Sequence, residues 1–121
     1  MFPNLHHVIA GHKSNLSMYD IFYDDKKLKL CLLSFLKSRK IYSLRTAFFS
    51  RCRYIWNAAT NFSPLRAKAI YENFCPENGV IYDYSAGFGG RMLGALSSQN
   101  NYTYIATEPN SDTYYNLIQL G

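Results

Sequence analysis

A glycine-rich turn between an apolar run and an amphipathic run places the strongest constraint on the fold of this chain. Residues 80–94 read Val-Ile-Tyr-Asp-Tyr-Ser-Ala-Gly-Phe-Gly-Gly-Arg-Met-Leu-Gly. The β-branched and aromatic residues 80–82 follow a turn signal at residues 76–79 and predict a strand, whereas the apolar residues from Met92 onward recur at helical spacing. This strand, turn and helix favour an α/β fold in which glycine backbone can approach a nucleotide-type ligand.

Two carboxylates flank this turn. Residues 102–107 predict a second strand, and Glu108 follows it, where a carboxylate can accept hydrogen bonds from both hydroxyls of a ribose. Asp83 ends the first strand, and its charge would repel a pyrophosphate at the turn. It can instead attract a positively charged ligand or order the turn that binds the ligand. Asp83 therefore favours S-adenosylmethionine, which carries an ammonium and a sulfonium but no phosphate, over a dinucleotide, whereas Glu108 does not separate the two because both carry an adenosine ribose.

Residues 83–90, Asp-Tyr-Ser-Ala-Gly-Phe-Gly-Gly, resemble the first motif of S-adenosylmethionine-dependent DNA methyltransferases that modify exocyclic amines. Residues 108–110, Glu-Pro-Asn, resemble their second motif, and residues 61–121 are similar to the opening half of adenine methyltransferase-like proteins of phages and mobile elements. The resemblance implies a Rossmann-like sheet that binds S-adenosylmethionine. It implies a cofactor-binding role for eight residues: Asn61, Phe62, Pro64, Asp83, Ser85, Gly87, Gly89 and Glu108.

The resemblance also implies which part of the cofactor each segment binds. The segment that matches residues 61–64 helps to hold its methionine end, and Ser85 stands where many family members carry an aromatic residue. We expect Asp83, Gly87, Gly89 and Glu108 to line one cofactor-sized cleft.

A motif that the family needs for catalysis is missing from the sequence. Family members carry a later Asp/Asn/Ser-Pro-Pro-Tyr/Phe motif that holds the target amine, and no Pro-Pro occurs here. We therefore interpret the chain as the opening portion of a methyltransferase, whether a truncated reading frame, a fragment or one half of a split enzyme. We assign no catalytic residue and expect no methyl transfer by this chain alone. The alternatives are an inactive nucleic-acid-binding module, a nucleotide-binding interaction protein and a portion of an RNA amino-methyltransferase.

The stretch before the glycine turn is strongly basic. Residues 26–68 contain no Asp or Glu and carry most of the net charge of +5. Their apolar spacing predicts one helix from about Lys26 and a second over residues 41–55, with a break near residues 38–40. Such a face suits a DNA backbone, whereas the alternative is an ordinary solvated helix face. The candidate nucleic-acid contacts are Arg45, Arg51 and Arg53.

We divide the chain into an N-terminal arm with the basic helical region, residues 1–57, and the first part of a Rossmann-like domain with an incomplete sheet, residues 58–121. The arm contains His6, His7 and His12, but no carboxylate has metal-ligand spacing to them, so we predict an ordinary polar segment and no metal site.

Several local features predict packing, and the composition predicts a location. Ser63 and Pro64 should start a helix that Pro76 stops, Asn110 or Ser111 should cap the last helix, and Trp56 should lie in the core. The cysteines, which are Cys31, Cys52 and Cys75, have no paired spacing and are predicted to be free and buried. No stretch predicts a membrane span or secretion signal, so a cytoplasmic location is the default expectation.

Overall fold

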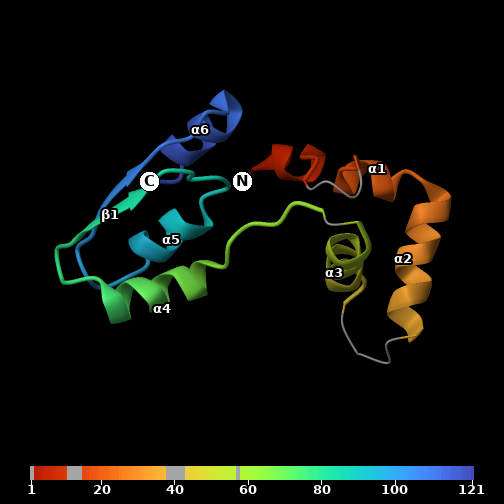
Figure 1. Ribbon diagram of the computed structural model, residues 1–121, viewed down its shortest axis with the longest axis horizontal. Coiled ribbons are helices and arrows are strands. Elements are labelled where there is room, and N and C mark those ends of the chain that lie inside the picture. Colours follow the sequence, from red (N-terminus) through yellow and green to blue (C-terminus); the bar gives the residue numbers. More distant parts are fainter. Residues whose placement is uncertain (1, 11–14, 38–42, 57) are drawn as a thin grey trace. The chain divides into compact units, whose positions relative to one another are not determined.

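The computed structural model describes residues 2–10, 15–37, 43–56 and 58–121 (Figure 1). The chain separates into two compact units. The helical unit comprises Pro3–Thr60, and the sheet unit comprises Phe2 together with Asn61–Gly121. The division falls three residues after the boundary expected between residues 57 and 58. The helix break expected near residues 38–40 lies outside the described residues.

The first part of the helical unit contributes to its core. It forms a 3₁₀ helix, Pro3–His7, and helix α1, Met18–Phe22. The prediction of a polar arm is wrong for this part, because Met18 and Ile21 are buried. A capping box starts α1: the Ser17 hydroxyl accepts from the Asp20 amide, and the Asp20 carboxylate accepts from the Ser17 amide at 2.8 Å.

Two longer helices complete this unit and confirm the two predicted in the basic region. They are α2, Asp25–Lys37, and α3, Leu44–Trp56. The carboxylate of Asp24 accepts hydrogen bonds from the first amides of α2, which explains why the helix begins there. Trp56 packs against the buried core, as predicted.

The sheet unit alternates helices and strands. Its elements are α4 (Pro64–Phe74), β1 (Val80–Asp83), α5 (Gly90–Leu96), β2 (Thr103–Ala106) and α6 (Ser111–Ile118). The two strands pair in parallel, with Val80 opposite Thr103 and Asp83 opposite Ala106. The prediction of a mixed α/β structure is thus confirmed, and its parallel strands are consistent with helical crossovers.

Local signals set the ends of these elements. Pro64 occupies the first turn of α4 after Ser63, and the helix ends at Phe74, just before Cys75 and Pro76. At the start of α6, the Asn110 side chain accepts a hydrogen bond from the Thr113 amide at 2.9 Å. These caps agree with the sequence predictions.

The three cysteines differ in burial. Cys31 and Cys52 lie together in the core of the helical unit, whereas Cys75 at the end of α4 is half-buried, so the prediction of burial is wrong for Cys75. All three are free thiols. Burial and, to a smaller extent, the neighbouring Cys31 together raise the pKa of Cys52 to about 12. Cys31 and Cys52 are both fully buried, and they act as small apolar side chains of the core.

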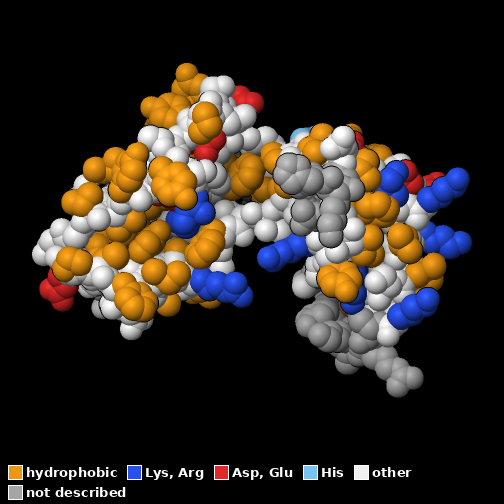
Figure 2. All heavy atoms as spheres, in the orientation of Figure 1, with side chains coloured by type: hydrophobic (Ala, Val, Ile, Leu, Met, Phe, Trp, Pro, Cys, Tyr) orange, Lys and Arg blue, Asp and Glu red, His pale blue; other side chains and the backbone are white. Residues whose placement is uncertain are grey.

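The sheet is covered on one face only. Ile81 and Asp83 are buried, whereas Val80 and Tyr82 on the other face of β1 are each 65% exposed. Ile105 of β2 pairs with Tyr82 and is also exposed. Figure 2 shows hydrophobic side chains over much of the visible surface of this unit.

Close packing of α5 against α4 depends on a glycine. A Cβ atom added at Gly94 would lie 2.4 Å from the Ala67 Cβ and 2.8 Å from the Lys68 backbone nitrogen. Since such distances are shorter than van der Waals contact, only glycine fits here without movement of α4.

Candidate functional site

The glycine turn lies at the carboxyl ends of both strands. The Thr107 amide donates to the Asp83 carbonyl at 3.0 Å, and the Ala86 amide donates to the Thr107 carbonyl at 2.9 Å. These bonds extend the β1–β2 pairing into the turn. The structure therefore brings Asp83 and Glu108 to the same end of the sheet, where ligands bind in open parallel α/β sheets.

Two glycines of the turn adopt left-handed backbone conformations. Gly87 has φ +57° and Gly89, the N-cap of α5, has φ +71°. A Cβ at Gly89 would lie 2.8 Å from Leu120 and 3.2 Å from Leu117, whereas the nearest atom to a Cβ at Gly87 is the Ser85 carbonyl oxygen, 3.9 Å away. Gly89 is thus needed for both conformation and space. At Gly87 the conformation is the constraint, and the space beside it is open to a ligand.

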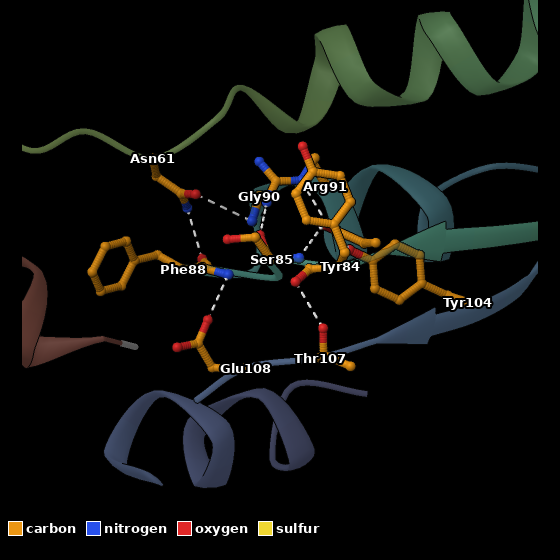
Figure 3. A network of polar contacts seen from close by, with 11 residues as sticks. Asn61, Tyr84, Ser85, Phe88, Gly90, Arg91, Tyr104, Thr107 and Glu108 are labelled. Atoms are coloured by element: carbon orange, nitrogen blue, oxygen red, sulfur yellow. Dashed lines mark hydrogen bonds and ion pairs between the residues drawn. The ribbon is translucent and has the colours of Figure 1, made fainter. Parts of the chain in front are cut away.

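Glu108 points toward this turn (Figure 3). Its Oε2 accepts from the Gly87 amide at 2.8 Å, and its Oε1 accepts from the Asn110 amide at 3.0 Å. An ionised carboxylate has about four acceptor positions. Two backbone bonds therefore leave Glu108 the capacity to accept from a ribose diol.

The segment before α4 clamps the turn from another side. Asn61 donates through Nδ2 to the Phe88 carbonyl at 2.7 Å and accepts through Oδ1 from the Gly90 amide at 3.2 Å (Figure 3). A Cβ at Gly90 would lie 2.0 Å from the Phe62 carbonyl oxygen. Asn61 and Phe62 therefore both reach the turn. The Pro64 carbonyl instead packs on α5 at Gly94.

Asp83 is the centre of a hydrogen-bonded cluster. Its Oδ2 accepts from Arg91 Nε at 2.6 Å and from the Tyr104 hydroxyl, and its Oδ1 accepts from the Ser85 amide at 3.1 Å. Arg91 also donates through Nη2 to the Ser85 carbonyl. Of the two roles considered for Asp83, these contacts favour ordering of the turn over direct attraction of a cationic ligand.

The electrostatics of the cluster keep Asp83 ionised. Burial alone would raise its pKa, but hydrogen bonds from Arg91, Tyr104 and the Ser85 amide outweigh burial and lower the pKa below the ordinary value. The same contact with Asp83 raises the pKa of Arg91. The pair is therefore a charged ion pair, with the Asp83 side chain 9% exposed.

A hollow of about 490 Å³ opens beside β1. Its lining residues are Tyr71, Ile81, Tyr82, Asp83, Tyr84, Ser85 and Arg91. Gly87, Gly89 and Glu108 do not line it. The single cleft expected to contain Asp83 with these three residues is therefore not this hollow.

Sequence reasoning missed Arg91 and Tyr104. Arg91 is the second residue of α5 and so lies in the first turn of the helix that follows the glycine turn, and Tyr104 pairs with Ile81 on the buried face of the sheet. For Tyr104 the signal was its position in the strand. Side chains of a strand point alternately to its two faces, and this places Tyr104 on the same face as Asp83. The direction of the Arg91 side chain had no such signal.

The structure brings together two of the three candidate nucleic-acid contacts. Arg45 and Arg53 are exposed on α3 and line one hollow of about 580 Å³, which Thr46 and Ser50 also line. Arg51 is half-buried and does not line it. Figure 2 shows basic side chains projecting from the helical unit.

The histidines that lie in the described residues make aromatic contacts. The His6 ring centroid lies 5.4 Å from that of Phe49, and the His7 centroid lies 4.5 Å from that of Tyr19. His12 lies outside the described residues. Among those that are described, no three His, Cys, Asp or Glu side chains form a metal-binding group. Within the same part of the chain, no helix has both the length and the apolar character needed to cross a bilayer.

No family model matches the chain, and comparison with curated proteins and with solved structures likewise finds no match. A proposal for its function therefore depends on the geometry of the turn, the strand ends and the helical unit.

Proposed function

We propose that the sheet unit binds S-adenosylmethionine and that the chain is the opening portion of a DNA amino-methyltransferase. The observation that supports this most is the position of Glu108. Its carboxylate faces the left-handed Gly87 at the carboxyl ends of two parallel strands, 2.8 Å from the Gly87 amide. A carboxylate that can accept hydrogen bonds from ribose hydroxyls, beside an open glycine turn, is the arrangement expected for an adenosine-type ligand.

The two carboxylates at the turn have different roles. Asp83 is buried and paired with Arg91, so it orders the turn while adding little net charge to it. Glu108 can accept from the adenosine ribose of S-adenosylmethionine and of a dinucleotide alike, so it does not separate the two ligands. Binding of this cofactor is the property that separates our proposal from a nucleotide-binding interaction protein, which would prefer a dinucleotide.

The uncovered face of the sheet supports a second polypeptide portion as a partner. Val80, Tyr82 and Ile105 expose apolar surface on the face opposite Ile81. A segment that supplies the Pro-Pro-Tyr/Phe motif would cover this face and hold the target amine in line with the methyl group. We propose that the chain transfers no methyl group without such a portion, and that it works in the cytoplasm.

Replacement of Glu108 with alanine tests the cofactor site. Loss of its charge-assisted hydrogen bonds to the ribose should weaken binding of S-adenosylhomocysteine by at least about 10-fold, since even one such bond contributes roughly 1.5–3 kcal/mol. Isothermal titration calorimetry measures the affinity. Glu77→Ala, which removes an exposed carboxylate from the turn before β1, is the matched control and should bind like the unmodified chain. Equal affinity of both variants would contradict the role of Glu108.

We also propose that the helical unit contacts the DNA backbone through Arg45 and Arg53. Both are exposed and share one hollow, whereas Arg51 is half-buried and makes a poorer phosphate contact. RNA is the alternative polymer, because an electrostatic contact to phosphates carries no sequence information.

Charge reversal of Arg45 and Arg53 together should weaken DNA binding and lower the salt dependence. Each lost phosphate contact reduces the slope of log K against log salt by about 0.9 for B-DNA. Fluorescence anisotropy over a salt series measures this slope. The charge-matched control is Lys26→Glu with Lys29→Glu, two exposed positions of α2. If both double variants change the slope equally, Arg45 and Arg53 do not form a specific contact surface.

A further inference from the structure

Arg91 lies where three parts of the glycine turn meet. Its Nε donates to Asp83 at the end of β1, its Nη2 donates to the Ser85 carbonyl in the turn, and its Cζ lies 5.8 Å from the centre of the Phe62 ring. Figure 3 shows the arginine side chain extending from α5 over the turn. One side chain thus connects the strand, the turn and the segment before α4.

Asp83 depends on this arginine for its charge balance. The other donors to its carboxylate, the Tyr104 hydroxyl and the Ser85 amide, are neutral. Since Asp83 is 8% exposed, water can replace the guanidinium only in part. Removing Arg91 would leave a buried carboxylate without a counter-charge, which is strongly unfavourable in a protein interior.

The carbonyl of Ser85 gives Arg91 a second function. Ser85 lies two residues before Gly87, and its amide and carbonyl are both engaged, by Asp83 and Arg91 respectively. The ion pair therefore fixes the peptide groups that lead into the left-handed glycine. These contacts hold the turn in one conformation before a ligand binds. The entropic cost of ordering the turn on binding is therefore lower than for a flexible loop.

We propose that Arg91 is the positioning residue of the glycine turn: it balances the charge of Asp83 and holds the Ser85 carbonyl, so that the turn has its binding conformation before the ligand arrives. Asp83 is then a structural partner of Arg91 and does not contact the ammonium of the ligand. This inference deepens the proposed function and depends on it only for the identity of the ligand.

Arg91→Gln tests the inference, with Arg66→Gln as the matched control. Arg66 is an exposed arginine of α4 in the same unit, so both variants lose one positive charge. In Arg91→Gln, the titration of the Asp83 carboxyl, followed by carbon-detected NMR, should move to higher pH, and the Ser85 and Gly87 amide signals should shift. Affinity for S-adenosylhomocysteine should fall at least tenfold. Arg66→Gln should change none of these.

A double variant separates charge balance from simple loss of packing. Asp83→Asn combined with Arg91→Gln removes both charges, so it should recover part of the affinity lost in Arg91→Gln. A double variant that binds no better than Arg91→Gln would overturn the inference. The unmodified chain provides a test that requires no variant: Asp83 should titrate below an ordinary aspartate, and titration at or above the ordinary value would also overturn it.

The NMR readouts distinguish this inference from the proposed function. The Asp83 titration and the amide shifts need no ligand. If both respond as predicted while the unmodified chain binds no S-adenosylhomocysteine, Arg91 positions the turn and the proposed cofactor is wrong. If the chain binds the nucleoside but Arg91→Gln leaves the turn and the affinity unchanged, the cofactor proposal stands and the role of Arg91 is refuted.

Discussion

Replacing Gly94 with alanine should destabilise the sheet unit by about 1–3 kcal/mol, the usual cost of overpacking. This direction is opposite to that of helix propensity, because alanine normally stabilises a helix interior by about 1 kcal/mol relative to glycine. The new methyl group would lie 2.4 Å from the Ala67 Cβ and 2.8 Å from both the Lys68 nitrogen and the Pro64 carbonyl oxygen. Two of these atoms belong to the backbone of α4, so the helices must move apart.

Urea unfolding monitored by circular dichroism measures this effect. Ala67→Gly in the Gly94→Ala background removes the nearest atom and should recover part of the lost stability, although the backbone contacts remain. The single variant Ala67→Gly serves as the control and completes a double-mutant cycle with a favourable coupling energy. If Gly94→Ala is as stable as the unmodified chain, α4 and α5 do not pack as closely as described.

Replacing Gly87 with valine should weaken binding of S-adenosylhomocysteine by about 10- to 100-fold. The φ of +57° is unfavourable for a β-branched residue, and strain of this kind costs on the order of 1–3 kcal/mol. The added side chain would also occupy the open space beside Gly87, where we place the ligand. Isothermal titration calorimetry measures the combined effect.

Gly87→Asn separates these two causes. Asparagine tolerates the left-handed conformation, and the nearest atom to its Cβ would be 3.9 Å away, so the turn itself should survive. Weak binding by the asparagine variant with an intact fold would indicate blocked approach of the ligand. If the valine variant binds as tightly as the unmodified chain, the ligand does not approach Gly87.

Local chemistry explains how much of the fold could be predicted from the sequence. The boundaries of β1 and α4 follow from Pro64, Pro76 and the β-branched and aromatic residues 80–82, all of which act within a few residues. The core contribution of Met18 and Ile21 could not be predicted in this way. Residues 16–23 read Leu-Ser-Met-Tyr-Asp-Ile-Phe-Tyr, and which of these apolar side chains is buried depends on packing against α2 and α3, which lie later in the sequence.

The candidate site shows the same limit. Gly87 and Gly89 could be predicted as site residues because left-handed backbone in a turn favours glycine. Glu108 could be predicted as a site residue because it directly follows a strand. The contact of Arg91 with Asp83 depends on a side-chain direction, which spacing alone does not determine. The separation of Arg51 from Arg45 and Arg53 was available in the sequence, because a spacing of eight residues keeps two side chains near one helix face and a spacing of six does not.

The most direct test of the proposed cofactor site is the amide NMR spectrum of the ¹⁵N-labelled chain during titration with S-adenosylhomocysteine. In the structure the Gly87 amide donates to Glu108, so a ribose bound to this carboxylate must change the environment of that amide. We predict saturable shifts of the Gly87, Gly89 and Glu108 signals, with α2 signals unmoved and no comparable shifts from a nicotinamide dinucleotide. Unchanged turn signals at saturating nucleoside, or shifts produced by the dinucleotide alone, would contradict the proposal.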